Sequence, residues 1–321
     1  MIRVAIVGAG IMGSSHARVL RAMPEVRVAA VVDPDEERGQ RLARYVDARY
    51  EPELAALCGQ AEAVVVATPT QTHADVAIKL MEWGLDVLIE KPIAAAIAEA
   101  EDLIAVAEKR DRILMIGHVE RFNPAVTELT RHIDGLIHID IRRIGPFTPR
   151  INGGVVLDLM IHDIELAQFF AGSDLLGCYS LTQQVRTQSE DIASCALVYA
   201  NGVTATLAAS RVSHTKQRQI ELTQRDNIIV ADLLRQQVTI HRIEHAEYAD
   251  EEGCRYRQSG VIEIPYLEHQ GEPLLLEDRH FIDCVRERTR PRVGGAHGLA
   301  ALAAAFRIRD TGVHVVSGTC A

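Results

Sequence analysis

The stretch Val4-Ala5-Ile6-Val7-Gly8-Ala9-Gly10-Ile11-Met12-Gly13 decides the fold of the first part of this chain. Its apolar residues indicate a buried strand, a GxGxxG pattern follows directly, and residues 14–23 then carry a helical pattern. In such a unit Gly8 permits a tight turn, Gly10 lets a pyrophosphate approach the backbone, and Gly13 allows close packing of helix on strand. The sequence therefore predicts a dinucleotide-binding loop at the positive end of a helix, with these contact residues: Gly8, Gly10, Ile11, Met12 and Gly13.

Short apolar runs alternate with helical patterns through the rest of the first third of the chain. They predict strands near residues 2–7, 27–32, 63–67, 86–89 and 112–116. Continuous apolar strands separated by helix-length segments are typical of a parallel sheet that is covered on both faces. We therefore expect an α/β Rossmann domain over residues 1–117.

The pattern changes after Gly117. We expect a helix near 123–132, a strand near 136–144, a helix over 155–171, a largely antiparallel sheet over 176–241, and helices near 275–288 and 297–310. Asn201-Gly202, between apolar runs, predicts a hairpin because both residues tolerate positive φ. Residues 242–260 are charge-rich without clear periodicity and suggest a mobile excursion. The second domain is thus an α+β domain over residues 118–321, whose last helix can pack back on the first.

Composition limits the classes of function. A chain of 321 residues can bury two cores, and a net charge of −10 argues against a nucleic-acid-binding protein. The chain opens as a strand, which leaves no room for a signal peptide, and no apolar run approaches the roughly 18 residues of a membrane span. Its scattered cysteines form no CxxC pair. We expect a cytoplasmic protein with reduced thiols and no membrane association.

Asp33 predicts which dinucleotide binds. It ends the second predicted strand, 20 residues after Gly13. A carboxylate there can accept both ribose hydroxyls of NAD and would repel a 2′-phosphate, so the expected cofactor is NAD. The third strand runs into a polar turn at the carboxyl edge of the sheet, where we expect cofactor contacts from Thr68, Pro69, Thr70 and His73. Thr72 is also a candidate helix N-cap, and both roles are compatible.

Two further motifs carry a family resemblance. Glu90-Lys91-Pro92 follows the fourth strand, and Asp158-x-x-x-His162 lies in the later helix. Together with the glycine loop they resemble the glucose-fructose oxidoreductase and inositol dehydrogenase family, written Gfo/Idh/MocA. The resemblance implies that Glu90 and Lys91 lie at the cofactor and that Lys91, Asp158 and His162 surround the substrate carbon that gives up hydride. It also predicts a cis Lys91–Pro92 bond.

The chemistry of alcohol oxidation independently explains why these residue types are present. Oxidation of a secondary alcohol needs a base for the hydroxyl proton, and either Lys91 or His162 can serve. An ammonium group is disfavoured in a dry crevice, whereas an imidazole titrates near neutrality already. Asp158 and His162 are four residues apart and share a helix face, so the carboxylate can orient the imidazole. The alternatives are a surface lysine and a helix-stabilising Asp/His pair.

A narrower resemblance suggests the substrate. Residues 117–124, 157–165, 189–194 and 210–211 resemble the nucleotide-sugar branch of the family. That branch implies oxidation at C3 of UDP-N-acetylglucosamine, giving a 3-oxo sugar for an aminotransferase and a 2,3-diamino sugar of lipid A. Guanidinium groups bind a diphosphate through forked hydrogen bonds, and the candidate substrate contacts are Arg121, Asn123, Arg143 and Arg150. The alternative for Arg142, Arg143 and Arg150 is a solvated loop or strand charge. No set of ligands is spaced for a metal, so none is expected.

Two other functions fit the same sequence. One is an inositol or free-sugar dehydrogenase that uses the same catalytic residues. The other is a regulator that keeps the Rossmann fold and binds nucleotide or sugar without turnover. An antiparallel sheet with one uncovered face often finds a partner, so a homodimer or homotetramer through the C-terminal sheet is expected.

Overall fold

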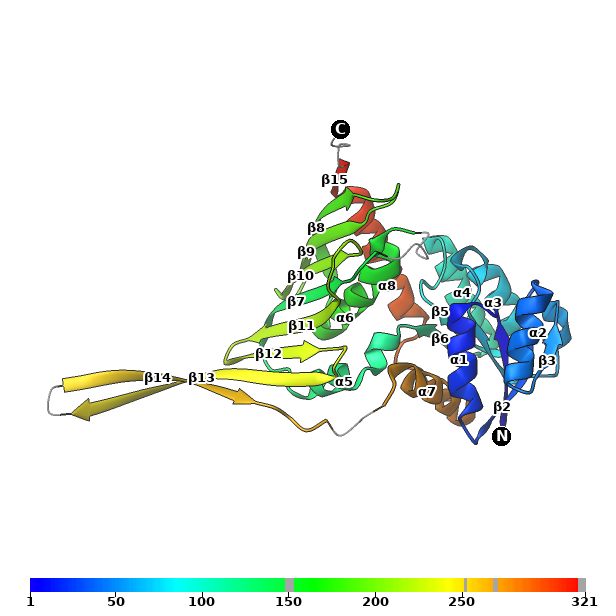
Figure 1. Ribbon diagram of the computed structural model, residues 1–321, viewed down its shortest axis with the longest axis horizontal. Coiled ribbons are helices and arrows are strands. Elements are labelled where there is room, and N and C mark those ends of the chain that lie inside the picture. The colour runs from blue at the N-terminus through cyan, green and yellow to red at the C-terminus, as the bar shows by residue number, and fades with distance from the viewer. Residues whose placement is uncertain (148–152, 251–252, 268–270, 317–321) are drawn as a thin grey trace. The chain divides into compact units, whose positions relative to one another are not determined.

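The computed structural model describes residues 1–147, 153–250, 253–267 and 271–316. The chain forms two compact units (Figure 1): Met1–Phe122 with Gly271–Ala303, and Asn123–Gln270 with Ala304–Ala321. This differs from a single division after residue 117. The difference arises because α7 (Pro273–Glu287) packs on α1 (Ile11–Arg21), and α8 (Gly295–Thr311) begins in the first unit and ends in the second.

The first unit is built on a six-stranded parallel sheet in the order β3-β2-β1-β4-β5-β6. Its strands are β1 (Ile2–Val7), β2 (Val26–Val32), β3 (Arg49–Glu51), β4 (Ala63–Val66), β5 (Asp86–Glu90) and β6 (Leu114–Gly117). All residues of β4 and β5 are buried, as expected for strands covered on both faces. This order confirms the predicted Rossmann fold.

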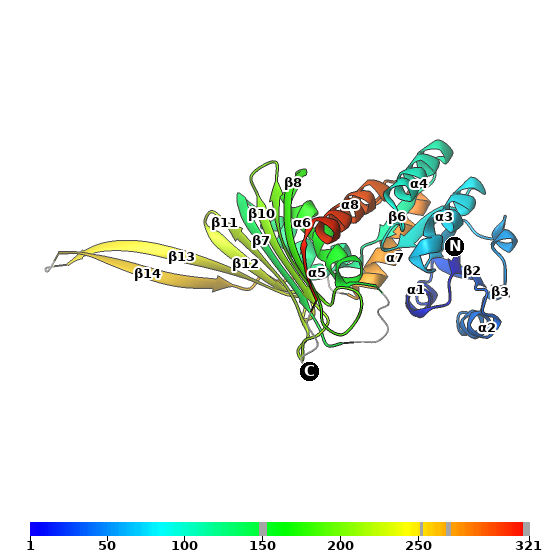
Figure 2. The same ribbon diagram turned by 90° about the horizontal axis from the view of Figure 1, so that it is seen from above.

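Helices cover both faces of this sheet (Figure 2). They are α1, α2 (Glu36–Tyr45), α3 (His73–Glu82), α4 (Ile97–Arg110), α7 and the start of α8, with short 3₁₀ turns η1 (Leu54–Leu57), η2 (Thr70–Thr72) and η3 (Val119–Phe122). α1 contacts α7, and α3 contacts α4. The predicted helices are thus present, and each connects neighbouring parallel strands or closes the unit.

The second unit is built on a nine-stranded sheet in the order β14-β13-β12-β11-β7-β10-β9-β8-β15. Its strands are β7 (Leu136–Ile144), β8 (Leu175–Gln184), β9 (Ile192–Tyr199), β10 (Thr204–Ser210), β11 (Gln217–Gln224), β12 (Asn227–Asp232), β13 (Gln237–Asp250), β14 (Gly253–Glu263) and β15 (Val313–Val316). Pairing is antiparallel except for β7 with β10 and β8 with β15. The largely antiparallel sheet and the hairpin at Asn201-Gly202 are confirmed, and Gly202 has the expected positive φ of 86°.

The sequence did not predict one hairpin in this unit. Residues 242–250 and 253–260, where a mobile excursion was expected, belong to the paired strands β13 and β14. β12 pairs with β13 as far as Arg242, and beyond it β13 pairs with β14 as a ribbon (Figure 1). His241 and Arg242 are consecutive and both exposed, so the strand buries neither face there. A ribbon of this kind needs no alternation of apolar residues, which is why periodicity did not reveal it.

Helices α5 (Pro124–Arg131) and α6 (Ile161–Ala171) pack on the sheet of the second unit. The predicted helix over 155–171 is divided, because its first turn, η4 (Val156–Met160), is a π-helix that leads into α6. Such π turns are rare in proteins, and those that occur often lie at functional sites. In the described part of the chain no helix is both long and apolar enough to cross a bilayer.

Candidate active site

The glycine loop has the geometry that a dinucleotide needs. Gly8 has a φ of 97°, and a Cβ there would lie 2.5 Å from the carbonyl oxygen of Ala67. A Cβ on Gly13 would lie 1.8 Å from the carbonyl oxygen of Gly8, so only glycine lets α1 approach the loop. A Cβ on Gly10 would meet nothing within 4 Å. The loop is thus tight on its inner side and open where a pyrophosphate would approach.

A cavity of about 590 Å³ lies beside this loop, at the carboxyl edge of the sheet. It is lined by Val7, Gly8, Gly10, Val32, Asp33, Pro34, Arg38, Pro52, Leu54, Ala67, Thr68, Pro69, Thr72 and Val76. Five of the predicted cofactor contacts lie in this lining: Gly8, Gly10, Asp33, Thr68 and Pro69. The other predicted contacts do not line it: Ile11, Met12, Gly13, Thr70, His73, Glu90 and Lys91. Ile11 and Met12 are exposed at the start of α1. A mostly apolar pocket with a carboxylate at its wall fits the adenosine half of NAD.

Asp33 is buried and fully hydrogen-bonded. One carboxylate oxygen accepts from the amide of Ala9 at 2.6 Å and the other from the amide of Asp35 at 2.8 Å. Arg38 donates to both oxygens, at 3.3 and 2.8 Å, from a side chain that is 43% exposed. Burial opposes ionisation, but these donors outweigh it and hold the pKa of Asp33 below its usual value. A carboxylate offers about four acceptor positions, and four donors already occupy those of Asp33. Ribose hydroxyls can therefore bind Asp33 only if Arg38 moves away from it.

His73 supports the site from behind. It is buried, and its Nδ1 lies 2.8 Å from the carbonyl oxygen of Pro92 while Nε2 lies 2.9 Å from that of Thr68. Burial lowers the pKa of His73, and the two carbonyl contacts only partly oppose it. The ring therefore joins the polar turn after β4 to the turn after β5. This position corrects the expectation of a direct cofactor contact, because both nitrogens face the protein itself.

Thr72 is the N-cap of α3, but its hydroxyl contacts Thr68 and the carbonyl of Pro69 instead of a helix amide.

Lys91 begins the turn after β5. The Lys91–Pro92 peptide bond is cis, as predicted. The Lys91 amide donates to Oε2 of Glu90 at 3.1 Å, and the Lys91 side chain is half-buried. The buried Glu90 carboxylate therefore points back along the chain toward the Lys91 backbone.

Two histidines that the catalytic prediction did not include, His118 and His297, lie near charged groups of the first unit. Burial, with the nearby charges of Lys91 and Arg121 and with His297, lowers the pKa of His118 to about 3. Burial and Arg121 also lower the pKa of His297. Both rings are neutral at physiological pH. His118 lies in residues 117–124, which carry the narrower resemblance, and nothing in the sequence linked His297 to it.

In the second unit, a buried ion pair fixes the start of the π turn that carries Asp158. Arg211 donates to Asp191 at 2.7 Å and to the carbonyl of Gly153 at 2.7 Å. Glu190 accepts from the amides of Val155 and Val156, through its carbonyl and its carboxylate respectively. A Cβ on residue 154 would lie 1.8 Å from the Glu190 carboxylate, so any larger residue there would displace this carboxylate. His162 follows on α6 and, like Asp158, is half-buried.

The remaining predicted substrate contacts have structural partners. Arg143 is 4% exposed, and its guanidinium binds the buried Asp163 with distances of 2.8 to 3.0 Å. Asn123 caps α5 through Ala125 and donates to the carbonyl of Leu233. Arg121 is buried in the first unit, and Arg150 lies outside the described residues. Arg143 and Asn123 therefore have roles in the fold, and the buried Arg143 is not the solvated charge that was the alternative for it.

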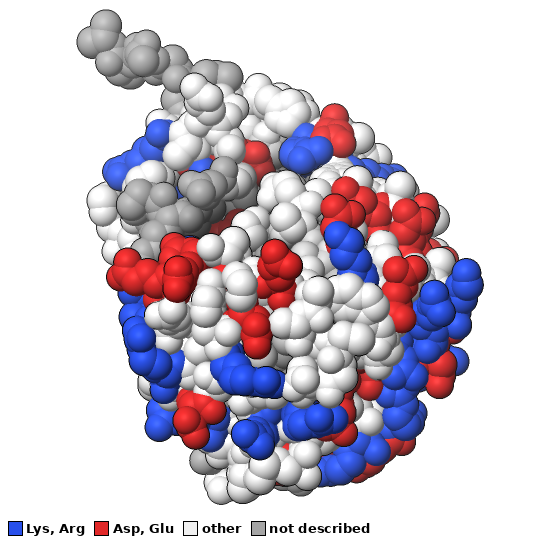
Figure 3. Space-filling view, turned by 90° about the vertical axis from the view of Figure 1, so that its right-hand side faces the viewer, with Lys and Arg blue, Asp and Glu red and all other residues white. Residues whose placement is uncertain are grey.

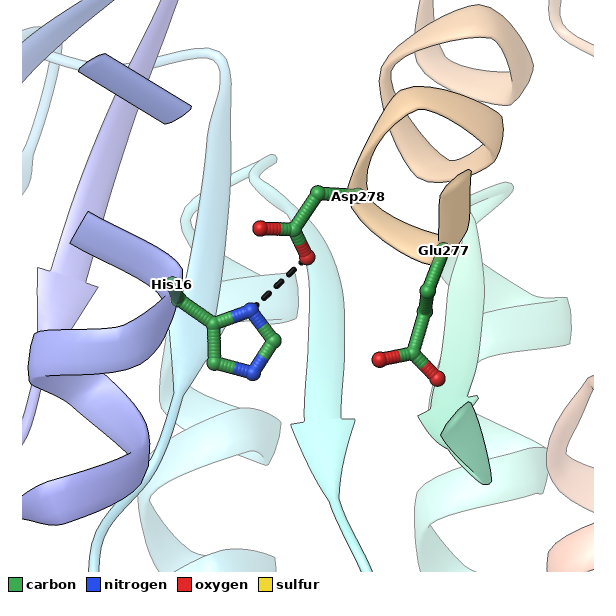
Figure 4. Close-up of side chains that lie close together, drawn as sticks. All are labelled: His16, Glu277 and Asp278. Atoms are coloured by element: carbon green, nitrogen blue, oxygen red, sulfur yellow. Dashed lines mark hydrogen bonds and ion pairs between the residues drawn. The ribbon is translucent and has the colours of Figure 1, made fainter. Parts of the chain in front are cut away.

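Three side chains that are far apart in the sequence meet in the first unit (Figure 4). His16 on α1 lies beside Glu277 and Asp278 on α7. A ring nitrogen of His16 and one carboxylate oxygen from each acidic residue all lie within 4.8 Å of one another. His16 Nδ1 is 2.7 Å from Asp278, and His16 Nε2 is 3.0 Å from Glu90. Both ring nitrogens thus have carboxylate partners. No motif spacing indicated this group.

The described surface carries mixed charges on the face drawn in Figure 3. Lysine and arginine side chains are interspersed with aspartate and glutamate side chains there. A nucleic-acid-binding face would gather basic groups.

Comparison with known proteins identifies the family of both units. Residues 2–118 match a family described as oxidoreductase family, NAD-binding Rossmann fold, and residues 137–229 match the GFO/IDH/MocA C-terminal domain. The chain is 30% identical over 310 residues to UDP-N-acetylglucosamine 3-dehydrogenase of Acidithiobacillus ferrooxidans, covering 96% of each chain. It is 25% identical over 316 residues to scyllo-inositol 2-dehydrogenase (NAD(+)) of Bacillus subtilis, covering 91% of this chain and 88% of that one.

Solved structures agree with this fold. A structure of the Acidithiobacillus ferrooxidans enzyme has a TM-score of 0.86 at 29% identity, with 96% of each chain covered. A levoglucosan dehydrogenase in complex with NADH has a TM-score of 0.81 at 18% identity, with 97% and 96% covered. The glycine loop, the Asp33 cavity and the Lys91 turn are thus parts of a known fold. This chain belongs to the Gfo/Idh/MocA oxidoreductase family and is an NAD-dependent dehydrogenase that acts on CH–OH groups.

Proposed function

We propose that this enzyme oxidises the C3 hydroxyl of UDP-N-acetylglucosamine to a ketone. The observation that carries the proposal is the match to UDP-N-acetylglucosamine 3-dehydrogenase, which extends over 96% of both chains at 30% identity. Two inositol dehydrogenases that match more than nine tenths of this chain, from Bacillus subtilis and Thermotoga maritima, do so at 25% identity. The 3-oxo product suits an aminotransferase that makes a 2,3-diamino sugar, the sugar found in certain lipid A molecules.

Charge near Lys91 favours a substrate that carries phosphate. The charges of Lys91 and Arg121 both act on the neutral ring of His118. A nucleotide sugar brings a diphosphate, which arginine binds well through forked hydrogen bonds, whereas a free polyol brings no anionic group. This arrangement supports a nucleotide sugar over the alternative, an inositol or free sugar.

The proposed roles follow from the chemistry of each side chain. NAD, once bound, supplies the hydride acceptor. His162 accepts the hydroxyl proton, and Asp158 orients the imidazole. Lys91 holds the substrate oxygen and stabilises the negative charge that develops on it. Asp33 binds the adenosine ribose, and the glycine loop binds the pyrophosphate.

A substrate panel tests the proposal. Purified enzyme with NAD is offered UDP-N-acetylglucosamine, UDP-glucose, N-acetylglucosamine, myo-inositol and scyllo-inositol, and NADH is followed at 340 nm. The expected result is NADH formation with UDP-N-acetylglucosamine at a kcat/KM well above that of every uncharged compound. Turnover of an inositol alone would favour the polyol alternative, and binding without turnover would favour a regulator.

We also propose that the chain assembles into a homodimer or homotetramer through the sheet of the second unit. α6 packs on β7 and β10. The buried residues Ala205, Leu207 and Ala209 alternate along β10 with less buried ones on its other face. Register places three exposed apolar side chains on that other face: Tyr179 (74%), Leu181 (48%) and Val313 (66%). Exposed apolar groups of this size are typical of interfaces.

A cytoplasmic location completes the proposal. Cys58, Cys178, Cys195 and Cys284 are all free thiols in the described structure, as a reducing compartment favours.

A further inference from the structure

The strand that ends in Glu90 is fixed at its catalytic end by a buried chain of polar groups. Asp278 of α7 binds His16 Nδ1 at 2.7 Å, and His16 Nε2 binds Glu90 Oε1 at 3.0 Å. The other Glu90 oxygen, Oε2, accepts from the amide of Lys91. Each link lies inside the first unit, and the His16 and Asp278 side chains are fully buried.

The ring of His16 is held as an imidazolium. Burial alone would lower its pKa, but the charge of Asp278 and hydrogen bonds to Asp278 and Glu90 raise it well above the usual value. Burial and the nearby charge of Glu90 raise the pKa of Glu277 well above its usual value. One positive ring therefore lies between two carboxylates, and both of its N–H groups donate.

Space as well as charge fixes the Glu90 carboxylate. A Cβ on Gly117 of β6 would lie 3.3 Å from the Glu90 carboxylate, so the side chain lies directly against the neighbouring strand. Gly117 lies on one side of the Glu90 carboxylate, and His16 holds its Oε1 atom. The position of Oε2, which accepts from the Lys91 amide, is therefore fixed. The orientation of the Lys91 backbone thus depends on a helix that begins at the glycine loop.

We propose that His16 is a positioning residue for Lys91, acting through Glu90 and anchored by Asp278. The inference rests on the proposed catalytic role of Lys91. Precise placement of a group that holds the reacting oxygen matters because a misplacement of about 1 Å can lower turnover roughly 100-fold. Because α1 also starts at the glycine loop, His16 connects the cofactor loop to the lysine turn through hydrogen bonds.

Two isosteric variants of His16 separate positioning from simple stability. Glutamine places an amide N–H near the position of Nε2 and keeps the bond to Glu90, whereas asparagine places it near Nδ1 and keeps the bond to Asp278. Both lose the ring charge. We expect His16→Gln to keep kcat within about fivefold of wild type and His16→Asn to lose roughly 100-fold, with the KM for NAD changed little in either.

A probe of Lys91 itself needs no turnover. The lysines of this chain are Lys79, Lys91, Lys109 and Lys216, so reductive methylation with ¹³C-formaldehyde gives few signals, and Lys91→Arg assigns one of them. The Lys91 signal should stay near its wild-type position in His16→Gln and move in His16→Asn. The methylated protein is measured without NAD or substrate, so a failure of the proposed substrate leaves this test intact.

Asp86→Asn is the matched control. Asp86 begins the same strand, is buried, and binds Arg288 and the amide of Ile113. Its loss should lower the melting temperature while kcat and the Lys91 signal stay unchanged. Glu90→Asp, whose shorter side chain cannot reach both His16 and the Lys91 amide, should behave like His16→Asn and replaces it if that variant does not fold. Equal kcat and equal Lys91 signals in His16→Gln and in His16→Asn or Glu90→Asp would overturn the proposal.

Discussion

At the scale of single residues, Asp33 and Arg38 decide which dinucleotide binds. Arg38 occupies two of the four acceptor positions of Asp33, and its side chain is partly exposed at the cavity wall. We predict that Asp33→Ser weakens NAD binding about 10- to 100-fold, the cost of losing charge-assisted hydrogen bonds. It should also improve binding of NADP, because the released Arg38 can meet a 2′-phosphate.

Titration of both cofactors against wild type, Asp33→Ser and Asp33→Ser/Arg38→Ala checks this prediction. The gain for NADP should appear in the single variant and vanish in the double variant. An unchanged preference for NAD in Asp33→Ser would show that Asp33 does not bind the ribose.

The proposed acid–base residues predict two different pH profiles. If His162 is the base, its protonation lowers kcat at acidic pH, and His162→Asn should remove that limb while lowering turnover throughout. Lys91→Met should lower turnover and leave the limb in place. NAD should bind both variants, since neither side chain is assigned to the ribose or pyrophosphate. A limb that persists in His162→Asn and disappears in Lys91→Met would reverse the two roles.

At the scale of elements, the Asp191–Arg211 pair holds the start of η4. Burial opposes ionisation of Asp191, but amide donors at residues 185 to 187 and Arg211 hold its pKa well below the usual value. A carboxylate with a depressed pKa contributes stability above its unfolded pKa of about 3.9, and the contribution is lost as pH falls through the folded value.

We therefore predict that Asp191→Asn lowers the stability of the protein by about 3 to 5 kcal/mol at neutral pH, because it leaves Arg211 buried without its partner. Chemical denaturation of both proteins from pH 7 to pH 3 should show the difference shrinking below pH 4. A difference independent of pH would mean that the Asp191 charge contributes nothing.

The helices and strands were predicted well where their packing imposes a regular pattern of apolar residues on the sequence. β1, β4 and β5 each contain a continuous apolar run because helices cover both faces of their sheet, and β9 and β10 flank a turn that glycine permits. The π turn of η4 could not be predicted, because it depends on Glu190 and Arg211, which lie on distant strands or turns. The β13–β14 ribbon was missed because it buries little of either face at its base.

At the scale of the whole molecule, the proposed assembly depends on the uncovered face of the second sheet. Tyr179→Glu with Leu181→Glu places two charges on that face and should convert the oligomer to monomers, because buried unpaired charges are costly. Sedimentation velocity measures the change. Tyr45→Glu, at a half-exposed tyrosine of the first unit, is the control and should leave the sedimentation coefficient unchanged. A monomeric wild type would contradict the proposed assembly.

The parts of the candidate site that could be predicted are those whose residues lie in short sequence motifs. The glycine loop, Asp33 and the Lys91 turn are local in sequence, and the structure brings the first two together around one cavity. Arg143 and Asn123 could not be assigned from sequence, because a buried arginine and a solvent-facing one look alike until a partner such as Asp163 is placed. The His16 network was invisible because Asp278 lies 262 residues from His16 and reaches it only through the packing of α7.

The most direct test of the central claim follows the hydrogen that leaves the substrate. UDP-N-acetylglucosamine carrying deuterium at C3 is incubated with the enzyme and NAD, and the reduced cofactor is analysed by mass spectrometry. The account predicts NADH with one added deuterium and a 3-oxo sugar in equal amount. Unlabelled NADH from the same substrate would place the oxidation at another carbon, and no reduced cofactor at all would contradict the proposed substrate.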